Sequence, residues 1–217
     1  MSKKTVKISI AGSAGRMGKM LVNVVDQHVE CELVAATCHP AEVEVIGKDA
    51  GLISGINKNN IFISDNPKEL LKGEVIIDFT TPESTVHNSN LAAENKIGLV
   101  IGTTGFSKKE ENLIKVFSRK IPILKAGNMS LGVNLLMYLT EIASKSLGNN
   151  FLSKIYEVHH KHKIDYPSGT ALMLGEGVAD GKNKNFYNLI GKKYLNKKTF
   201  PYAKKINFNS IRKGEVI

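Results

Sequence analysis

The densest group of side chains able to do chemistry lies within residues 157–171, which read E-V-H-H-K-H-K-I-D-Y-P-S-G-T-A. Three histidines and two lysines occupy the five positions from His159 to Lys163. Packing does not need such a group, and burying it is costly. Because histidine titrates near neutral pH and a crowded lysine can release its proton more readily, the segment predicts an anion-binding site for proton transfer.

The reach of the chain adds a geometric condition. In a fully extended segment His159 and Lys163 would share a face but stand about 13 Å apart, too far to serve one small substrate. We therefore expect a turn near Lys161. Helical spacing begins at Thr170, so the N–H groups of Gly169 and Thr170 would form a helix N-terminus suited to a carboxylate.

Two other interpretations of the cluster stay open, a metal site and a solvated basic loop. No cysteine or His-Glu-x-x-His frame accompanies the histidines, and adjacent histidines cannot easily share one ion, so we expect no metal. The net charge of +10 is concentrated in residues 182–217, with ten Lys and Arg against Glu215. That stretch could bind nucleic acid. The favoured interpretation is that it is a solvated loop, or that its positive electrostatic field attracts small anions.

A second motif, Gly12-x-x-Gly15-x-x-Gly18, follows an apolar run and opens a helical pattern. These glycines would allow a tight turn, close approach of backbone N–H groups to a pyrophosphate, and close packing of helix on strand. Arg16 could also contact phosphate. The loops 102–105 and 126–128 occupy the positions that would complete a dinucleotide site.

The elements that must position these residues follow a β-α pattern up to about residue 129. Predicted strands are Val6–Ala11, Leu33–Thr37, Ile61–Ser64, Val75–Phe79, Leu99–Ile101 and Ile121–Leu124; predicted helices are Met17–Gln27, Pro82–Glu94 and Ser107–Ser118. Ser107 and Glu110 have capping-box spacing. A long helix, Leu131–Leu147, a strand, Leu152–His160, a helix, Thr170–Ala179, and a late strand, Lys205–Ile211, follow. We predict a Rossmann-like doubly wound parallel sheet in residues 1–129 and an α+β substrate and oligomerisation domain in residues 130–217.

Composition places the chain among globular proteins, with 42% hydrophobic and 23% charged residues over 217 positions. No apolar run approaches the length of a membrane helix, and no signal-peptide pattern opens the sequence, so we expect a cytoplasmic protein. Cys31 and Cys38 show no paired spacing and are interpreted as reduced thiols.

Five motifs in this order resemble the dihydrodipicolinate reductase family: G-x-x-G-R-M-G from Gly12, Asp78-Phe79-Thr80, Gly102-Thr103-Thr104-Gly105-Phe106, Asn128-Met129-Ser130, and E-x-H-H-K-H-K-x-D-x-P-S-G-T-A from Glu157. The resemblance implies reduction of 4-hydroxy-tetrahydrodipicolinate to tetrahydrodipicolinate, with loss of water, in lysine and diaminopimelate biosynthesis. Hydride would pass from NADH or NADPH to C4 of the ring. The resemblance also implies a homotetramer.

Site residues follow from the same resemblance. His159 and Lys163 match the proton-donor positions, and His160, Gly169 and Thr170 match the substrate-binding positions. The positions that match cofactor contacts are Gly12, Ser13, Ala14, Gly15, Arg16, Met17, Gly102, Thr103, Thr104, Ala126, Gly127, Asn128 and Met129. The family pattern continues for several dozen residues beyond such a late strand, so the second domain is expected to be truncated at its C-terminus.

Cofactor preference depends on the end of the second strand, where the family has an acid and this chain has Cys38-His39. Both residues are expected to contact the cofactor. Without a carboxylate to repel a 2′-phosphate, and with His39 and Arg16 nearby, we expect modest preference for NADPH that grows as falling pH charges His39. The alternative is that Glu42 or Glu44 folds back to replace the acid.

Two readings from other classes remain. A semialdehyde dehydrogenase would need a nucleophilic cysteine near the nicotinamide, whereas Cys31 and Cys38 lie at the adenosine end. A nucleotide-sensing or nucleic-acid-binding protein would leave the cluster from His159 to Lys163 without a purpose.

Overall fold

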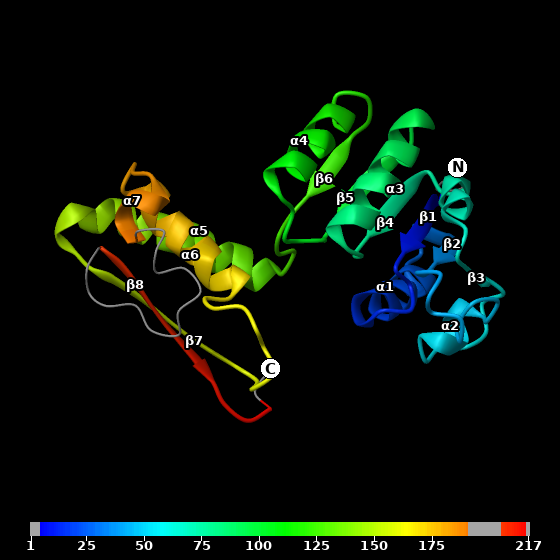
Figure 1. Ribbon diagram of the computed structural model, residues 1–217, viewed down its shortest axis with the longest axis horizontal. Coiled ribbons are helices and arrows are strands. Elements are labelled where there is room, and N and C mark those ends of the chain that lie inside the picture. The colour runs from blue at the N-terminus through cyan, green and yellow to red at the C-terminus, as the bar shows by residue number, and fades with distance from the viewer. Residues whose placement is uncertain (1–4, 191–204, 216–217) are drawn as a thin grey trace. The chain divides into compact units, whose positions relative to one another are not determined.

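The computed structural model describes residues 5–190 and 205–215. The chain divides into two compact units, Met1–Gly127 and Asn128–Ile217. Figure 1 labels the α-helices and β-strands of both.

The first unit is built on one parallel sheet in the order β3-β2-β1-β4-β5-β6. Its strands are β1 (Val6–Ala11), β2 (Cys31–Thr37), β3 (Ile63–Ser64), β4 (Val75–Asp78), β5 (Gly98–Ile101) and β6 (Ile123–Lys125). The connecting helices are α1 (Arg16–Gln27), α2 (Ala50–Ile53), the 3-10 helix η1 (Pro67–Lys72), α3 (Pro82–Glu94) and α4 (Lys108–Phe117). The direction of winding reverses between β1 and β4, and such sheets bind ligands beyond the carboxyl ends of the strands at that point.

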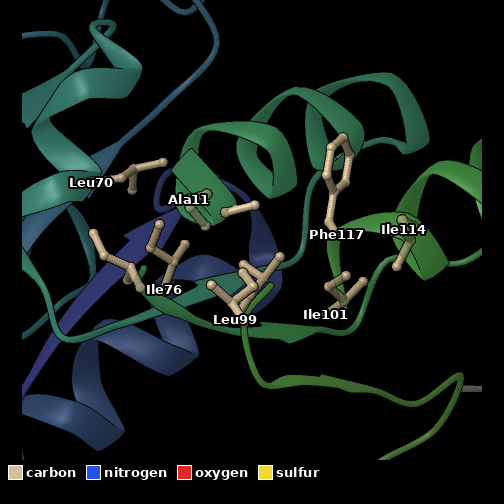
Figure 2. Close-up of a cluster of buried hydrophobic side chains, with 11 residues drawn as sticks. Ala11, Leu70, Ile76, Leu99, Ile101, Ile114 and Phe117 are labelled. Carbon is tan, nitrogen blue, oxygen red and sulfur yellow. The ribbon is translucent and has the colours of Figure 1, made fainter. Parts of the chain in front are cut away.

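Helices cover both faces of this sheet. Successive side chains of a strand point to opposite faces, so each strand contributes to the apolar clusters on both sides. On β4, Ile76 belongs to the cluster under α3 and α4, whereas Ile77 packs with the cluster under α1 and α2. Figure 2 shows the first cluster, which includes Ala11, Leu70, Leu99, Ile101, Ile114 and Phe117. The predicted doubly wound parallel sheet is confirmed.

The second unit pairs two parallel strands, β7 (Ser153–His159) and β8 (Ile206–Arg212), from Ser153 opposite Ile206 to His159 opposite Arg212. Its helices are α5 (Leu131–Leu147), the 3-10 helix η2 (Gly148–Asn150), α6 (Gly169–Gly181) and α7 (Phe186–Ile190). Buried side chains of β8, α6 and α7, Phe208 among them, form its core. Lys182, just beyond α6, is buried, and its Nζ donates to the carbonyl oxygen of Gly148 at 2.6 Å.

Most predicted elements agree with the observed ones. The strand Val6–Ala11 and the helix Pro82–Glu94 have the predicted bounds, and Ser107 and Glu110 form the predicted capping box. The short helices α2, η1 and α7 were missed, because four to six residues do not establish a 3.6-residue period. The basic stretch lies partly outside the described residues, which include neither Lys192, Lys193, Lys197, Lys198 nor Lys204.

Candidate active site

A cavity of about 1040 Å³ lies in the first unit, beyond the carboxyl ends of β1, β2 and β4. This is the position at which a doubly wound sheet binds a nucleotide. The described residues that line it are Ala11, Gly12, Gly15, Thr37, Cys38, His39, Pro40, Glu42, Asp65, Pro67, Phe79, Thr80, Thr81, Pro82, Glu83, Ser84, His87, Asn88 and Glu110.

The glycine loop between β1 and α1 has no room for side chains. Gly12 has φ +73°, and a Cβ there would lie 2.8 Å from Thr80 Cγ2. A Cβ on Gly18 would lie 2.0 Å from the carbonyl oxygen of Gly12. Gly15 is the N-cap of α1, and no described side chain caps it, so the first-turn N–H groups keep their capacity to bind an anion. These features fit the pyrophosphate of a dinucleotide.

A fully buried carboxylate at the end of β4 holds the next loop. Asp78 accepts hydrogen bonds from the Thr80 hydroxyl at 2.6 Å, the Thr85 hydroxyl at 3.0 Å and the Asn88 amide at 2.9 Å. The Thr80 N–H lies 3.0 Å from both Asp78 Oδ1 and Thr103 Oγ1. Asp78 therefore links the cavity wall at Thr80 to the loop after β5.

The loop after β5 packs directly on the loop after β4. A Cβ on Gly102 would lie 2.1 Å from the Phe79 ring, so only glycine lets the two loops approach this closely. Thr103 is buried and belongs to the Asp78 network, whereas Thr104 is exposed.

The end of β2 carries a buried thiol, a histidine and an acid. Burial raises the pKa of the Cys38 thiol, and the nearby Glu42 and Asp65 carboxylates raise it further. A nucleophilic cysteine needs the opposite shift, so this environment argues against the semialdehyde dehydrogenase interpretation. The His39 N–H donates to Glu42 Oε2 at 3.0 Å, and His39 Nδ1 accepts from the Ala41 N–H at 3.1 Å.

The histidine and lysine cluster lies in the second unit, where β7 ends at His159. The Lys163 N–H donates to the carbonyl oxygen of His160 at 3.2 Å, which closes a turn around Lys161 and His162. The predicted turn near Lys161 is confirmed. This turn brings Lys163 back toward the end of the strand.

Glu157 lies behind His159 and organises the surrounding groups. Its Oε2 contacts His159 Nδ1, and its Oε1 accepts from Arg212 Nη2 at 3.1 Å and from the Ser168 N–H at 3.3 Å. Burial alone would raise the pKa of Glu157, but Ser210 and the Arg212 guanidinium beside it hold that pKa below its usual range. The carboxylate therefore stays charged near neutral pH and can accept an Nδ1–H of His159.

Arg212, on β8, joins the rest of the segment to this carboxylate. Its Nε donates to the carbonyl oxygen of Lys163 at 3.3 Å, and its guanidinium lies 4.2 Å from the centre of the Tyr166 ring. Lys163 Nζ lies 2.8 Å from Asp165 Oδ1. Burial would raise the pKa of Asp165, but the hydrogen bond and charge of Lys163 lower it.

The N-terminus of α6 closes the arrangement. Ser168 is the N-cap residue, with its hydroxyl accepting from the Ala171 N–H at 3.2 Å. Gly169 is exposed, and a Cβ there would meet nothing within 4 Å, so there is open space beside it. Asn128 Nδ2 lies 3.4 Å from Thr170 Oγ1. One segment thus carries histidine, lysine and a helix N-terminus, which are groups suited to an anion that exchanges a proton, and the buried side chain of Arg212 holds this segment to β8.

The predicted site residues divide into several groups. Gly12, Gly15, Cys38 and His39 line the cavity of the first unit. The substrate and proton-donor residues, His159, His160, Lys163, Gly169 and Thr170, belong to one segment of the second unit. Ser13 is buried and donates to the carbonyl oxygen of Thr37. The other predicted cofactor residues, Ala14, Arg16, Met17, Gly102, Thr103, Thr104, Ala126, Gly127, Asn128 and Met129, are not among the described cavity-lining residues.

Sequence reasoning missed several residues that take part. Glu157 and Arg212 are 55 positions apart, and strand pairing brings them together. The sequence interpretation includes Asp78 only as part of a family motif. An acid at the end of an apolar strand could by itself have indicated a buried, hydrogen-bonded carboxylate. Within the described residues, no group of three His, Cys, Asp or Glu side chains is arranged to hold a metal ion, and no helix is long and apolar enough to cross a membrane.

Two family models match the chain, "Dihydrodipicolinate reductase, N-terminus" over residues 6–129 and "Dihydrodipicolinate reductase, C-terminus" over residues 132–217. A 4-hydroxy-tetrahydrodipicolinate reductase of Pelagibacter ubique (strain HTCC1062) is 58% identical over 214 residues, covering 99% of this chain and 79% of that protein. Another from Psychrobacter arcticus is 35% identical over 217 residues, covering 100% and 78%. The solved structure of dipicolinate-bound dihydrodipicolinate reductase from Paenisporosarcina sp. TG-14 has a TM-score of 0.71 at 25% identity, covering 97% of this chain and 79% of that one.

The Asp78 network generates a prediction. Asp78→Asn places an amide nitrogen among donors, so we expect the free energy of unfolding to fall by about 2–4 kcal/mol and NADH binding to weaken. Urea unfolding and fluorescence titration with NADH measure the two effects. Glu94→Gln is the matched control, because Glu94 accepts a hydrogen bond from Asn90 on the exposed side of α3. Unchanged stability of Asp78→Asn would contradict the role given to this carboxylate.

Proposed function

This chain belongs to the dihydrodipicolinate reductase family, and we propose that it reduces 4-hydroxy-tetrahydrodipicolinate by using His159 and Lys163 as its proton-donating residues. The reaction gives tetrahydrodipicolinate with loss of water and serves lysine and diaminopimelate biosynthesis. The observation that carries the residue assignment is the contact of Glu157 with His159 Nδ1, within a segment that also presents Lys163 and the N-terminus of α6. When bound, NADH or NADPH supplies the hydride.

The residues assigned to cofactor binding are those of the glycine loop. Gly12 and Gly15 line the cavity, and the first turn of α1 presents N–H groups to a pyrophosphate. Phe79 and Thr80 form another part of the wall, held in place through Asp78. These residues bind and orient the dinucleotide.

The residues assigned to substrate binding are cationic or present backbone donors. The substrate is a dicarboxylate, and the Paenisporosarcina relative was solved with dipicolinate bound. Gly169 and Thr170 offer N–H groups at the start of α6, and Lys163 and His160 offer positive charge or hydrogen bonds. Asp165 keeps Lys163 in place by an ion pair.

Proton delivery is assigned through the hydrogen bonding of His159. Because the charged Glu157 carboxylate faces Nδ1, the proton on Nδ1 is held there and Nε2 is the nitrogen left to exchange a proton. Arg212 balances the charge of Glu157, so the carboxylate orients His159 without taking its proton. Lys163 is the second donor and acts on the same anion.

Assembly as a homotetramer is part of the proposal. α5 exposes a series of large apolar side chains, and β7 exposes Tyr156 and Val158. On α5 these are Leu131, Leu135, Leu136, Tyr138, Leu139, Ile142 and Leu147. Exposed apolar surface of this kind is typical of subunit interfaces. We also propose a cytoplasmic location, where a biosynthetic reductase finds its nicotinamide cofactor.

The proton-donor assignment predicts a separation of turnover from cofactor binding. In His159→Ala and Lys163→Ala, kcat should fall roughly 100-fold or more while the dissociation constant for NADH stays unchanged. A synthase fed pyruvate and aspartate semialdehyde would supply substrate, with NADH and NADPH oxidation as the readout. Lys161→Ala is the control, because this exposed lysine forms an ion pair with the likewise exposed Glu215, away from the proposed proton donors. Equal losses of turnover and NADH affinity would count against these roles.

Glu157 predicts a pH-dependent effect on stability. A carboxyl whose pKa is lowered by folding stabilises the protein above its unfolded pKa, and that contribution disappears as the pH falls through the folded pKa. Glu157→Gln should therefore be less stable than the parent protein near pH 7, with the difference shrinking below about pH 4. Its kcat should also fall, whereas NADH affinity should not. A stability difference that stays constant down to pH 3 would contradict the assignment.

The oligomer proposal is tested by light scattering at micromolar concentration. A mass of four chains is expected. Replacing exposed Leu135 and Leu139 with glutamine should shift the mass toward smaller species, because both side chains lie on the exposed side of α5. A monomer in the parent protein would reject the proposal.

A further inference from the structure

Two of the carboxylates that line the cavity of the first unit, Glu42 and Asp65, come from the loops that follow β2 and β3. The parallel register pairs Thr37 with Ser64, so the residues that follow them, Cys38 and Asp65, leave the sheet at the same edge. The Cys38 N–H donates to the carbonyl oxygen of Ser64 at 3.0 Å, which extends this pairing by one step. Cys38 and Asp65 both line the cavity.

Glu42 reaches the same edge because the loop after β2 folds back on itself. The Glu42 N–H donates to the carbonyl oxygen of His39 at 2.9 Å, while Glu42 Oε2 accepts from the His39 N–H at 3.0 Å. His39 Nδ1 accepts from the Ala41 N–H at 3.1 Å, which fixes the same turn. A carboxylate has about four acceptor sites on two oxygens, and the bond from His39 uses one of them.

The charges around this part of the cavity have one sign. None of the described cavity-lining residues is lysine or arginine, whereas four are acids, Glu42, Asp65, Glu83 and Glu110. Both Glu42 and Asp65 are close enough to Cys38 to raise the pKa of its thiol, after the larger effect of burial. Arg16, which was expected to favour a phosphate, is not among the described lining residues.

We propose that Glu42 binds the adenosine ribose hydroxyls and that Glu42 and Asp65 together make this enzyme prefer NADH over NADPH. In dinucleotide-binding folds an acid beyond the second strand accepts hydrogen bonds from the ribose. Here that acid comes from the folded-back loop instead of the strand end. A 2′-phosphate would meet two carboxylates with no described cation in the cavity wall. The inference rests on the proposed function in one respect, namely that this cavity binds a nicotinamide dinucleotide, and it replaces the NADPH preference expected from His39 and Arg16.

Direct binding tests this proposal without depending on turnover. Titration of the full chain with NADH and with NADPH, followed by nicotinamide fluorescence, should give at least tenfold tighter binding of NADH. Glu42→Gln keeps an oxygen that can accept from the His39 N–H, so the turn is retained while the charge is lost. This variant should bind NADH about tenfold more weakly, with NADPH binding unchanged or tighter. Asp65→Asn should tighten NADPH binding and leave NADH binding unchanged.

Glu44→Gln is the matched control, because Glu44 lies in the same loop but is not among the described cavity-lining residues. It should leave both affinities unchanged, and thermal unfolding of each variant checks that the loop has not disturbed the fold. NADPH binding as tight as NADH in the parent protein would overturn the proposal, as would an unchanged ratio of the two affinities in Glu42→Gln. Absence of binding to either dinucleotide would instead reject the proposed function.

Discussion

A carboxylate without solvent exposure, at the end of a central strand, must have its negative charge satisfied by the protein itself, and Asp78 is in this position. The donors that satisfy it come from Thr80, Thr85 and Asn88, so the loop after β4 and the first turns of α3 are fixed around one group. Thr103 joins the loop after β5 to the same network. The glycine loop then approaches this frame so closely that Gly12 has no space for a Cβ beside Thr80. One buried charge and contacts that only glycine permits therefore fix three loops, of which those after β1 and β4 line the cavity, and this preorganises the wall before a ligand binds.

The second unit also positions its functional groups through a buried carboxylate, that of Glu157. Glu157 is an acid with 9% of its side chain exposed, and Arg212, with 4%, is its partner. Leaving either charge alone would cost several kcal/mol, so the pair is maintained, and it fixes the groups attached to it. These groups are His159, the carbonyl oxygen of Lys163 and the N-cap of α6. A proton donor has to meet its substrate within hydrogen-bonding distance, and this arrangement limits the positions that His159 and Lys163 can take.

The sequence was sufficient for the features that depend on local pattern. Runs of alternating or continuous apolar residues predicted all six strands of the first sheet, and the limited reach of an extended chain predicted the turn at Lys161. The features that could not be predicted from the sequence depend on contacts between residues that are distant along the chain. Arg212 reaches Glu157 only because β8 pairs with β7, and the orientation of Glu42 depends on a turn whose hydrogen bonds involve His39. The expected NADPH preference rests on residue types at the strand end and does not include the turn that places Glu42 in the cavity wall, so it stays a prediction. Short helices such as α2 were missed because one turn has no period to detect.

The central claim is that this chain transfers hydride from a nicotinamide to the ring of 4-hydroxy-tetrahydrodipicolinate while its own residues supply the proton. The most direct measurement uses NADH carrying deuterium at both C4 positions of the nicotinamide, with substrate formed in place by the synthase and the product analysed by NMR. The account predicts one deuterium at C4 of tetrahydrodipicolinate, with the released water and solvent contributing none at that position. Oxidation of NADH without deuterium in the product, or a label at another ring carbon, would contradict it.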